Sequence, residues 1–274
     1  MSGVVITVGP TGSLATKADH PRLPTTPEEI AAEASASYEA GAAVVSIHLR
    51  DRQGRPTADL SIARRTIDLI RDQSPVLVQV SSGVAVDATF EERAQLLELR
   101  SRMMTLSPCS MTFNQGEFRN PPDFVRRLAW RMRELGIKPE LEIYDTGHVD
   151  AAIRLLDEEL LTPPLQFGIV MGVRGGMTAT PANLIHTVRS LPEGSIWQAI
   201  AIGKANFPLG AVAITLGGNV RTGLEDNLYI RRGELAHGNA QLVSRVKEIC
   251  EALNRSVATV TETERILGLG AVMA

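Results

Sequence analysis

The residue types best suited to acid–base or metal chemistry gather at the ends of short apolar segments. The densest group spans residues 217–227, which read Gly-Gly-Asn-Val-Arg-Thr-Gly-Leu-Glu-Asp-Asn and carry Arg221, Glu225 and Asp226. Divalent metal ions bind carboxylate oxygen together with imidazole nitrogen readily. This stretch therefore indicates a metal or acid–base site, with a solvated charged loop as the alternative interpretation.

A histidine that could complete such a site lies in residues 46–51, Ser-Ile-His-Leu-Arg-Asp. Alternate residues of a strand point to the same side, so Ser46, His48 and Arg50 share one face. A face of this kind is costly to bury unless it binds something. A core histidine whose ring is satisfied by a neighbouring carbonyl is the alternative.

A third polar face appears in residues 140–145, where Glu140, Glu142 and Tyr144 alternate with apolar residues. Two carboxylates and a phenol that point inward suggest proton transfer or support of a metal. A structural ion pair with Arg50 or Arg221 is the alternative, and it suits Glu140 best because that residue lies lower in the strand.

Hydroxyl groups and a glycine-rich turn follow three further segments. Ser81, Ser82 and Thr105 could hold a substrate carboxylate or could cap the next helices. The turn Gly-Val-Arg-Gly-Gly at residues 172–176 suits a phosphate, although such turns are also common for steric reasons. The chain contains neither a Walker A loop nor a Gly-x-Gly-x-x-Gly dinucleotide motif.

The elements that must position these residues are eight β-branched runs separated by amphipathic stretches. Runs such as 76–80 are nearly continuous in apolar residues, as strands of a parallel sheet are. Strand–helix alternation over this length predicts a single-domain (β/α)8 TIM barrel over residues 1–274, with the active site at the carboxyl ends of its strands. The predicted strands are residues 4–8, 43–49, 76–80, 103–106, 140–144, 165–171, 196–202 and 219–222.

Several helix starts carry capping residues. Thr26, followed by a proline and two glutamates, predicts a capping box, and Thr180 precedes a proline in the same way. Asn120 and Asn239 are predicted to open two further helices.

Composition excludes several classes of protein. The 274 residues are 44% hydrophobic and 22% charged, and the net charge of −3 argues against a nucleic-acid or anionic-membrane partner. Two cysteines are too few for a disulfide framework. We find no targeting segment and no membrane-length apolar run, so a soluble cytoplasmic protein is expected.

The motifs together resemble the β-keto acid cleavage enzyme family. The resemblance spans nearly the whole chain and implies a divalent metal, usually zinc, and acetyl-CoA as co-substrate. It implies that a β-keto acid is converted to acetoacetate and a new acyl-CoA by a homo-oligomer, a tetramer by resemblance. The segments that carry it are residues 23–29, 41–43, 47–51, 139–142, 172–176, 217–227, 239–243 and 262–269.

The resemblance also assigns roles to residues. His48 and Glu225 would bind the metal, Asp226 would be the base, and Arg221 and Glu142 would support the reacting carboxylate and proton transfer. The pocket and the CoA contacts are interpreted from position, and they comprise Ser81, Ser82, Thr105 and Leu14 for substrate, and Arg174, Gly175, Gly176 and Lys204 for CoA.

Three positions depart from the family pattern. Ser46 replaces the first histidine of a His-x-His pair, so it would contribute through a water, or metal binding would be weak or lost. Leu14 replaces a glutamate suited to an ammonium group, which argues against the cationic 3-keto-5-aminohexanoate as substrate. Asn219 replaces a histidine, with no consequence that the sequence reveals.

Two other functions remain open at this point. One is a metal-assisted retro-aldol lyase on the same barrel, which would need no CoA. The other is a degenerate barrel that binds a carboxylate without turnover. Ser46 favours this second alternative, whereas the retained Glu142, Arg221, Glu225 and Asp226 argue against it.

Overall fold

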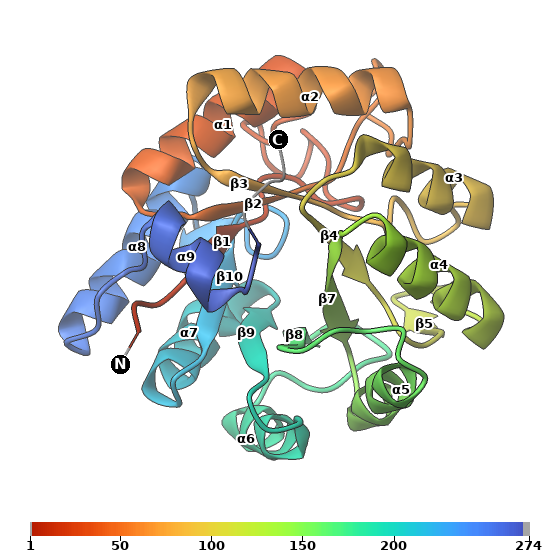
Figure 1. Ribbon diagram of the computed structural model, residues 1–274. Helices are drawn as coiled ribbons and strands as arrows, with labels where there is room; N and C mark the ends of the chain where they lie inside the picture. Colours follow the sequence, from red (N-terminus) through yellow and green to blue (C-terminus); the bar gives the residue numbers. More distant parts are fainter. Residues whose placement is uncertain (1, 271–274) are drawn as a thin grey trace.

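A closed barrel of eight parallel strands forms the centre of the molecule in the computed structural model, which describes residues 2–270 (Figure 1). The order around the barrel is β1-β10-β9-β8-β7-β4-β3-β2, and pairing of Ile6 with Val220 closes the ring. The predicted TIM barrel is confirmed. Its strands are β1 Ile6–Val8, β2 Val44–Ile47, β3 Leu77–Val80, β4 Met103–Leu106, β7 Lys138–Ile143, β8 Gln166–Met171, β9 Ile196–Ala201 and β10 Asn219–Thr222.

Helices surround the barrel (Figure 1), and their apolar residues join those of the strands in one buried core. In α2, for example, Ala63, Ile67 and Ile70 recur at helical spacing and are buried. The helices are α1 Pro27–Ala40, α2 Leu60–Gln73, α3 Phe90–Gln95 with the 3-10 turn η1 Leu96–Leu99, α4 Pro122–Glu134, α5 Thr146–Asp157, α6 Pro181–Ser190, η2 Gly203–Ala205, α7 Asn206–Thr215 and α8 Asn239–Ala252.

The helix starts agree with the sequence in part. Thr26 and Glu29 form the predicted capping box of α1. Asn120 does not cap α4, because its side chain accepts a hydrogen bond from Arg93 at 2.7 Å. Asn239 is the first residue of α8 rather than its cap, since its side chain is used to accept from the backbone of the loop after β10.

The last helix, α9 Val260–Ile266, covers the amino-terminal end of the barrel. Ala258 and Leu267, which flank it, pack against the first residues of several strands, including Val44 and Met103. Across residues 2–270, no helix combines the length and the apolar character needed to span a membrane.

Two short hairpins interrupt the strand–helix alternation, and the sequence analysis predicted neither. One consists of β5 Met111–Phe113 and β6 Gly116–Phe118, and the other of β11 Tyr229–Arg231 and β12 Glu234–Leu235. The β5–β6 hairpin follows β4, so it extends from the carboxyl end of the barrel, where the site residues lie.

Candidate active site

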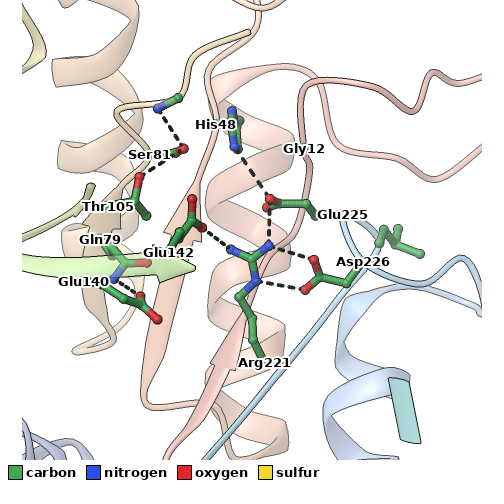
Figure 2. A network of polar contacts seen from close by, with 12 residues as sticks. Gly12, His48, Gln79, Ser81, Thr105, Glu140, Glu142, Arg221, Glu225 and Asp226 are labelled. Atoms are coloured by element: carbon green, nitrogen blue, oxygen red, sulfur yellow. Dashed lines mark hydrogen bonds and ion pairs between the residues drawn. The ribbon is translucent and has the colours of Figure 1, made fainter. Parts of the chain in front are cut away.

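The guanidinium of Arg221, at the end of β10, is the centre of a buried polar cluster (Figure 2). Its Nη2 donates to Asp226 Oδ1 at 2.7 Å and to Glu225 Oε1 at 2.9 Å, while its Nε donates to Asp226 Oδ2 at 2.9 Å. Across the barrel, Nη1 lies 3.4 Å from Glu142 Oε1 on β7. The four residues singled out in the sequence therefore meet at one point. Together with His48, they are called the floor of the site.

Glu225 reaches this point because the loop after β1 leaves room for it. A Cβ on Gly12 would lie 2.6 Å from Glu225 Cγ, and a Cβ on Gly9 would lie 2.7 Å from Glu225 Oε2. The buried Arg50 holds the same loop by donating to the carbonyl oxygens of Gly12 and of Ala15, the latter at 2.9 Å. The side chain of Arg50 thus holds the loop in place through the backbone oxygens of the loop.

His48 faces Glu225 as a neutral ring. Its Nδ1 lies 3.2 Å from the carbonyl oxygen of Val84, and its Nε2 lies 3.6 Å from Glu225 Oε1. A carbonyl oxygen can only accept, so Nδ1 carries the proton and Nε2 directs a lone pair at the carboxylate. Burial, and then the nearby charge of Arg221, lowers the pKa of His48 to about 4. The alternative interpretation, a core histidine satisfied by a carbonyl, accounts for Nδ1 but not for Nε2, which faces Glu225.

Acidic groups outnumber basic groups on the floor. Three carboxyl groups surround Arg221, and Arg50 is the second cation whose charge acts on Glu225. Burial, more than Arg221 can offset, raises the pKa of Glu142 to about 7 and that of Glu225 to about 8. Such a cluster favours the uptake of protons or of a cation.

Two possible donors to a divalent cation, His48 and Glu225, are adjacent on the floor. His48 Nε2 and Glu225 face each other, and Glu225 Oε2 is buried without a hydrogen-bond partner among the described residues. Ser46, two positions before His48 on β2, is fully buried, and its hydroxyl likewise has no partner there. Within residues 2–270, no group of three or more His, Cys, Asp or Glu side chains suits a metal. Catalytic zinc usually has three protein ligands, so other ligands would have to complete this site.

A cavity of about 160 Å³ lies above the floor, at the carboxyl ends of the strands. Leu14 lines its mouth and is 56% exposed. The walls are mostly apolar, and they are formed by Ala85, Val86, Phe113, Phe118, Tyr144, Val170, Val173 and Ile202.

Phe113 and Phe118 come from the β5–β6 hairpin and were missed in the sequence. The available signal was short: Met111 and Phe113 flank Thr112, and Phe118 follows a polar stretch that begins at Asn114. Asn114 adopts the left-handed conformation typical of tight turns, with a φ of 56°.

The predicted substrate-binding hydroxyls have different surroundings. Ser81 lines the cavity. The side chain of Ser82 donates to the backbone oxygen of Thr105 at 2.6 Å, and the backbone NH of Ser82 donates to the Thr105 hydroxyl at 3.0 Å. These two residues therefore join the ends of β3 and β4, and Thr105 reaches Ser81 only at 3.5 Å.

The glycine-rich turn after β8 packs against the β5–β6 hairpin. The backbone oxygen of Arg174 accepts from Asn114 at 2.9 Å. Gly175 has a φ of +101°, and a Cβ there would lie 2.0 Å from the oxygen of Thr112. A Cβ on Gly176 would lie 3.1 Å from the oxygen of Tyr144. Close packing thus accounts for both glycines.

The cationic side chains near this turn lie outside the cavity. Arg174 is exposed beside Val173, which lines the cavity, and Lys204 is exposed two residues after Ile202, which also lines it. Both cations are thus near the mouth.

Glu140 belongs to a layer beneath the floor. Its carboxylate accepts hydrogen bonds from the side-chain amides of Gln79 and Gln198 (Figure 2 shows the first). Burial raises its pKa. Its side-chain partners are these amides, in place of the ion pair considered in the sequence.

These features define a TIM barrel with a buried cluster of charged residues beneath a mostly apolar cavity at the carboxyl ends of its strands. A sequence profile of the family described as beta-keto acid cleavage enzyme matches residues 3–269. The chain belongs to this family, which confirms the resemblance of its motifs.

Two relatives and one solved structure illustrate the match. The chain is 39% identical over 271 residues to a 3-keto-5-aminohexanoate cleavage enzyme of Fusobacterium nucleatum, covering 98% of this chain and 99% of that protein. It is 35% identical to a 3-oxoadipate:acetyl-CoA acetyltransferase of Cupriavidus necator, covering 97% and 94%. The complex of ObcA with oxaloacetate has the same fold, with a TM-score of 0.81 at 24% identity over 91% of this chain and 68% of that chain.

Proposed function

We propose that this chain cleaves a β-keto acid in a reaction with acetyl-CoA. The bond between C2 and C3 of the keto acid breaks, C2 joins the acetyl group to give acetoacetate, and the remaining acyl group leaves on CoA. The observation that carries the proposal is the buried floor, where Arg221 contacts Asp226, Glu225 and Glu142 beneath the cavity. The family and the acetyl-CoA named for the Cupriavidus relative support it.

Asp226 is the proposed base. Both of its oxygens accept hydrogen bonds from Arg221, which fixes the orientation of the carboxyl group at the cavity. Arg221 also offers a fixed positive charge to the negative charge that develops on the substrate. Glu142, whose pKa burial raises to about 7, is the proposed group that holds and releases a proton near neutral pH.

A divalent metal, zinc by resemblance, would be held by His48 and Glu225. When bound, it would act as a Lewis acid that polarises the keto oxygen. Ser46, the third residue proposed from the sequence, offers only a neutral hydroxyl. This difference supports a site in which substrate or water supplies the missing ligands.

The proposed CoA contacts are Arg174, the Gly175–Gly176 turn and Lys204. The two cations are exposed and adjoin residues of the cavity wall, which suits the phosphates of a ligand whose thioester end enters the cavity. The proposed substrate-binding residues are Ser81, Ser82, Thr105 and Leu14. Among these, Leu14 supports a substrate other than the cationic 3-keto-5-aminohexanoate.

We also propose a homo-oligomer, a tetramer by resemblance to the family, and a cytoplasmic location. The paucity of cysteine supports the location, and the net charge of −3 supports a small-molecule partner rather than nucleic acid.

The test is a product analysis with and without acetyl-CoA. Purified protein is incubated with zinc, 3-oxohexanoate and acetyl-CoA, and the expected products are acetoacetate and butyryl-CoA in equal amounts. Asp226→Asn should lower kcat/KM by roughly 10²–10⁴-fold, the range for loss of a general base. Cleavage without acetyl-CoA would identify a lyase, and substrate binding without any turnover would identify a binding barrel.

A further inference from the structure

Charge and apolar surface are separated within the cavity. Every charged or imidazole side chain that lines it, within the described part of the chain, belongs to the floor. The walls above are largely hydrocarbon, with Val86, Val173 and Ile202 facing the same space as the two phenylalanines of the β5–β6 hairpin. The polar residues among the walls, Ser13, Ser81 and Asn114, carry no charge. A β-keto acid has its reacting carboxylate and keto group at one end, so the floor receives that end and the walls receive the rest.

The aromatic part of the wall is held in place. The ring of Phe113 meets that of Phe118 edge-on, with centroids 6.2 Å apart, and that of Tyr144 at 5.9 Å. The guanidinium of Arg93 lies 4.8 Å from the centroid of Phe118 and is also stacked on Phe124 at 4.9 Å. Rings fixed by such contacts present a surface that a ligand can use without first ordering it.

Arg93 is itself fully engaged. It is 1% exposed and donates to the backbone oxygens of Ser82 at 3.0 Å and Arg119 at 2.9 Å, as well as to Asn120 Oδ1 at 2.7 Å. One buried side chain therefore links the loop after β3, which leads into the cavity wall, to the residues that follow β6. The position of Phe118 depends on this link.

We propose that the β5–β6 hairpin forms an acyl pocket that selects β-keto acids with a short, neutral, apolar side chain. This rests on the proposed function and names its substrate class. A carboxylate or ammonium at the far end of the substrate would lose its hydration against Phe113, Phe118 and Val173, with no opposite charge among the wall residues. A methyl or methylene group there gains from burial.

The test uses two series of ligands. In the first, kcat/KM with acetyl-CoA is measured for 3-oxopentanoate, 3-oxohexanoate and 3-oxooctanoate, and for 3-oxoadipate and 3-keto-5-aminohexanoate. In the second, binding of butyrate, hexanoate, glutarate and 4-trimethylammoniobutyrate to zinc-loaded protein is measured by calorimetry. The trimethylammonium probe is included because paired aromatic rings can also bind such a cation.

The expected result is a gain of about fourfold per added methylene, the factor that corresponds to burial of one CH₂, until the chain meets the hairpin. Charged analogues should be at least about 100-fold poorer, because no wall residue compensates their charge. Phe113→Ala should shift the preference toward 3-oxooctanoate. Phe90→Ala, which truncates a phenylalanine stacked on Phe124 outside the cavity, is the matched control and should leave the preference unchanged.

The outcomes separate the pocket from the reaction. If hexanoate binds better than butyrate and glutarate but no keto acid is cleaved, the proposed function fails and the acyl pocket stands. If keto acids are cleaved but 3-oxoadipate or 3-keto-5-aminohexanoate is the preferred substrate, the proposal of an acyl pocket is overturned. Equal or absent binding across the carboxylates, or tightest binding of 4-trimethylammoniobutyrate, also overturns it.

Discussion

The excess of carboxyl groups on the floor should make the metal-free protein less stable as the pH rises from 6.5 to 8. Burial raises the pKa of Glu142 to about 7 and that of Glu225 to about 8, from an ordinary value of 4.5. At pH 6.5 both groups are mainly protonated in the folded protein and ionised in the unfolded chain. The unfolded state therefore binds fewer protons, and the free energy of unfolding falls as the pH increases.

The size of the effect follows from these two values. Over the pH range in which it is protonated only in the folded state, each group lowers the free energy of unfolding by about 1.4 kcal/mol per pH unit. Both contribute up to pH 7 and only Glu225 contributes from 7 to 8, so the total loss is about 3 kcal/mol. Below pH 6.5, His48 acts in the opposite sense: burial lowers its pKa to about 4, so the stability it contributes is lost as the pH falls. The interval from 6.5 to 8 therefore separates the titration of the glutamates from that of His48.

Calorimetry in the presence of a chelator measures this loss directly. At roughly 2–4 °C per kcal/mol for a protein of this size, Tm should fall by about 6–12 °C across the interval. The control is the double variant Glu142→Gln and Glu225→Gln, which removes both titrating groups and should show a much flatter profile. An equal decline in both proteins would refute the reasoning, because the loss would then arise elsewhere in the molecule.

The remaining predictions concern the metal and the hairpin. Ser46→His should tighten zinc binding at least about tenfold, the scale of an added ligand, and His48→Ala should abolish it, as measured by chelator competition; unchanged affinity in both would contradict the two-donor site. Gly175→Ala should destabilise the protein by about 1–3 kcal/mol more than Gly194→Ala, measured by thermal unfolding. The two glycines share a positive φ, but only the first would place its Cβ against Thr112, whereas the second faces open space, so equal losses would exclude the clash.

The floor residues could be predicted because each of them is indicated by a pattern within a short stretch of sequence. Alternation along one strand determines that Glu142 points inward, and eight repeated strand–helix units determine that the barrel closes. Closure then brings Glu142 to Arg221, although 79 positions separate them. The capping box of Thr26 and Glu29 was also predictable, because every group that forms it lies within one helical turn.

The parts that escaped prediction depend on contacts between distant segments. The sequence could not show that the Ser82 hydroxyl donates to the backbone oxygen of Thr105, because that contact depends on the pairing of β3 with β4. Asn120 has the composition of a helix cap, yet the buried Arg93 takes its oxygen. The charge pattern of α3 does not indicate that Arg93 is buried against two aromatic rings.

The division of the site between strands and loops has a consequence for the divergence of such enzymes. The floor is built largely on barrel strands and on the turn that directly follows β10, whereas the aromatic wall is carried by a hairpin outside the barrel. Substitutions at Val86, Phe113 or Val173 would change the shape of the cavity while the floor residues keep their positions. A library for directed evolution should therefore vary these wall positions and keep Arg93 constant. Family members with the same floor could therefore diverge in substrate preference through substitutions at this small set of wall residues.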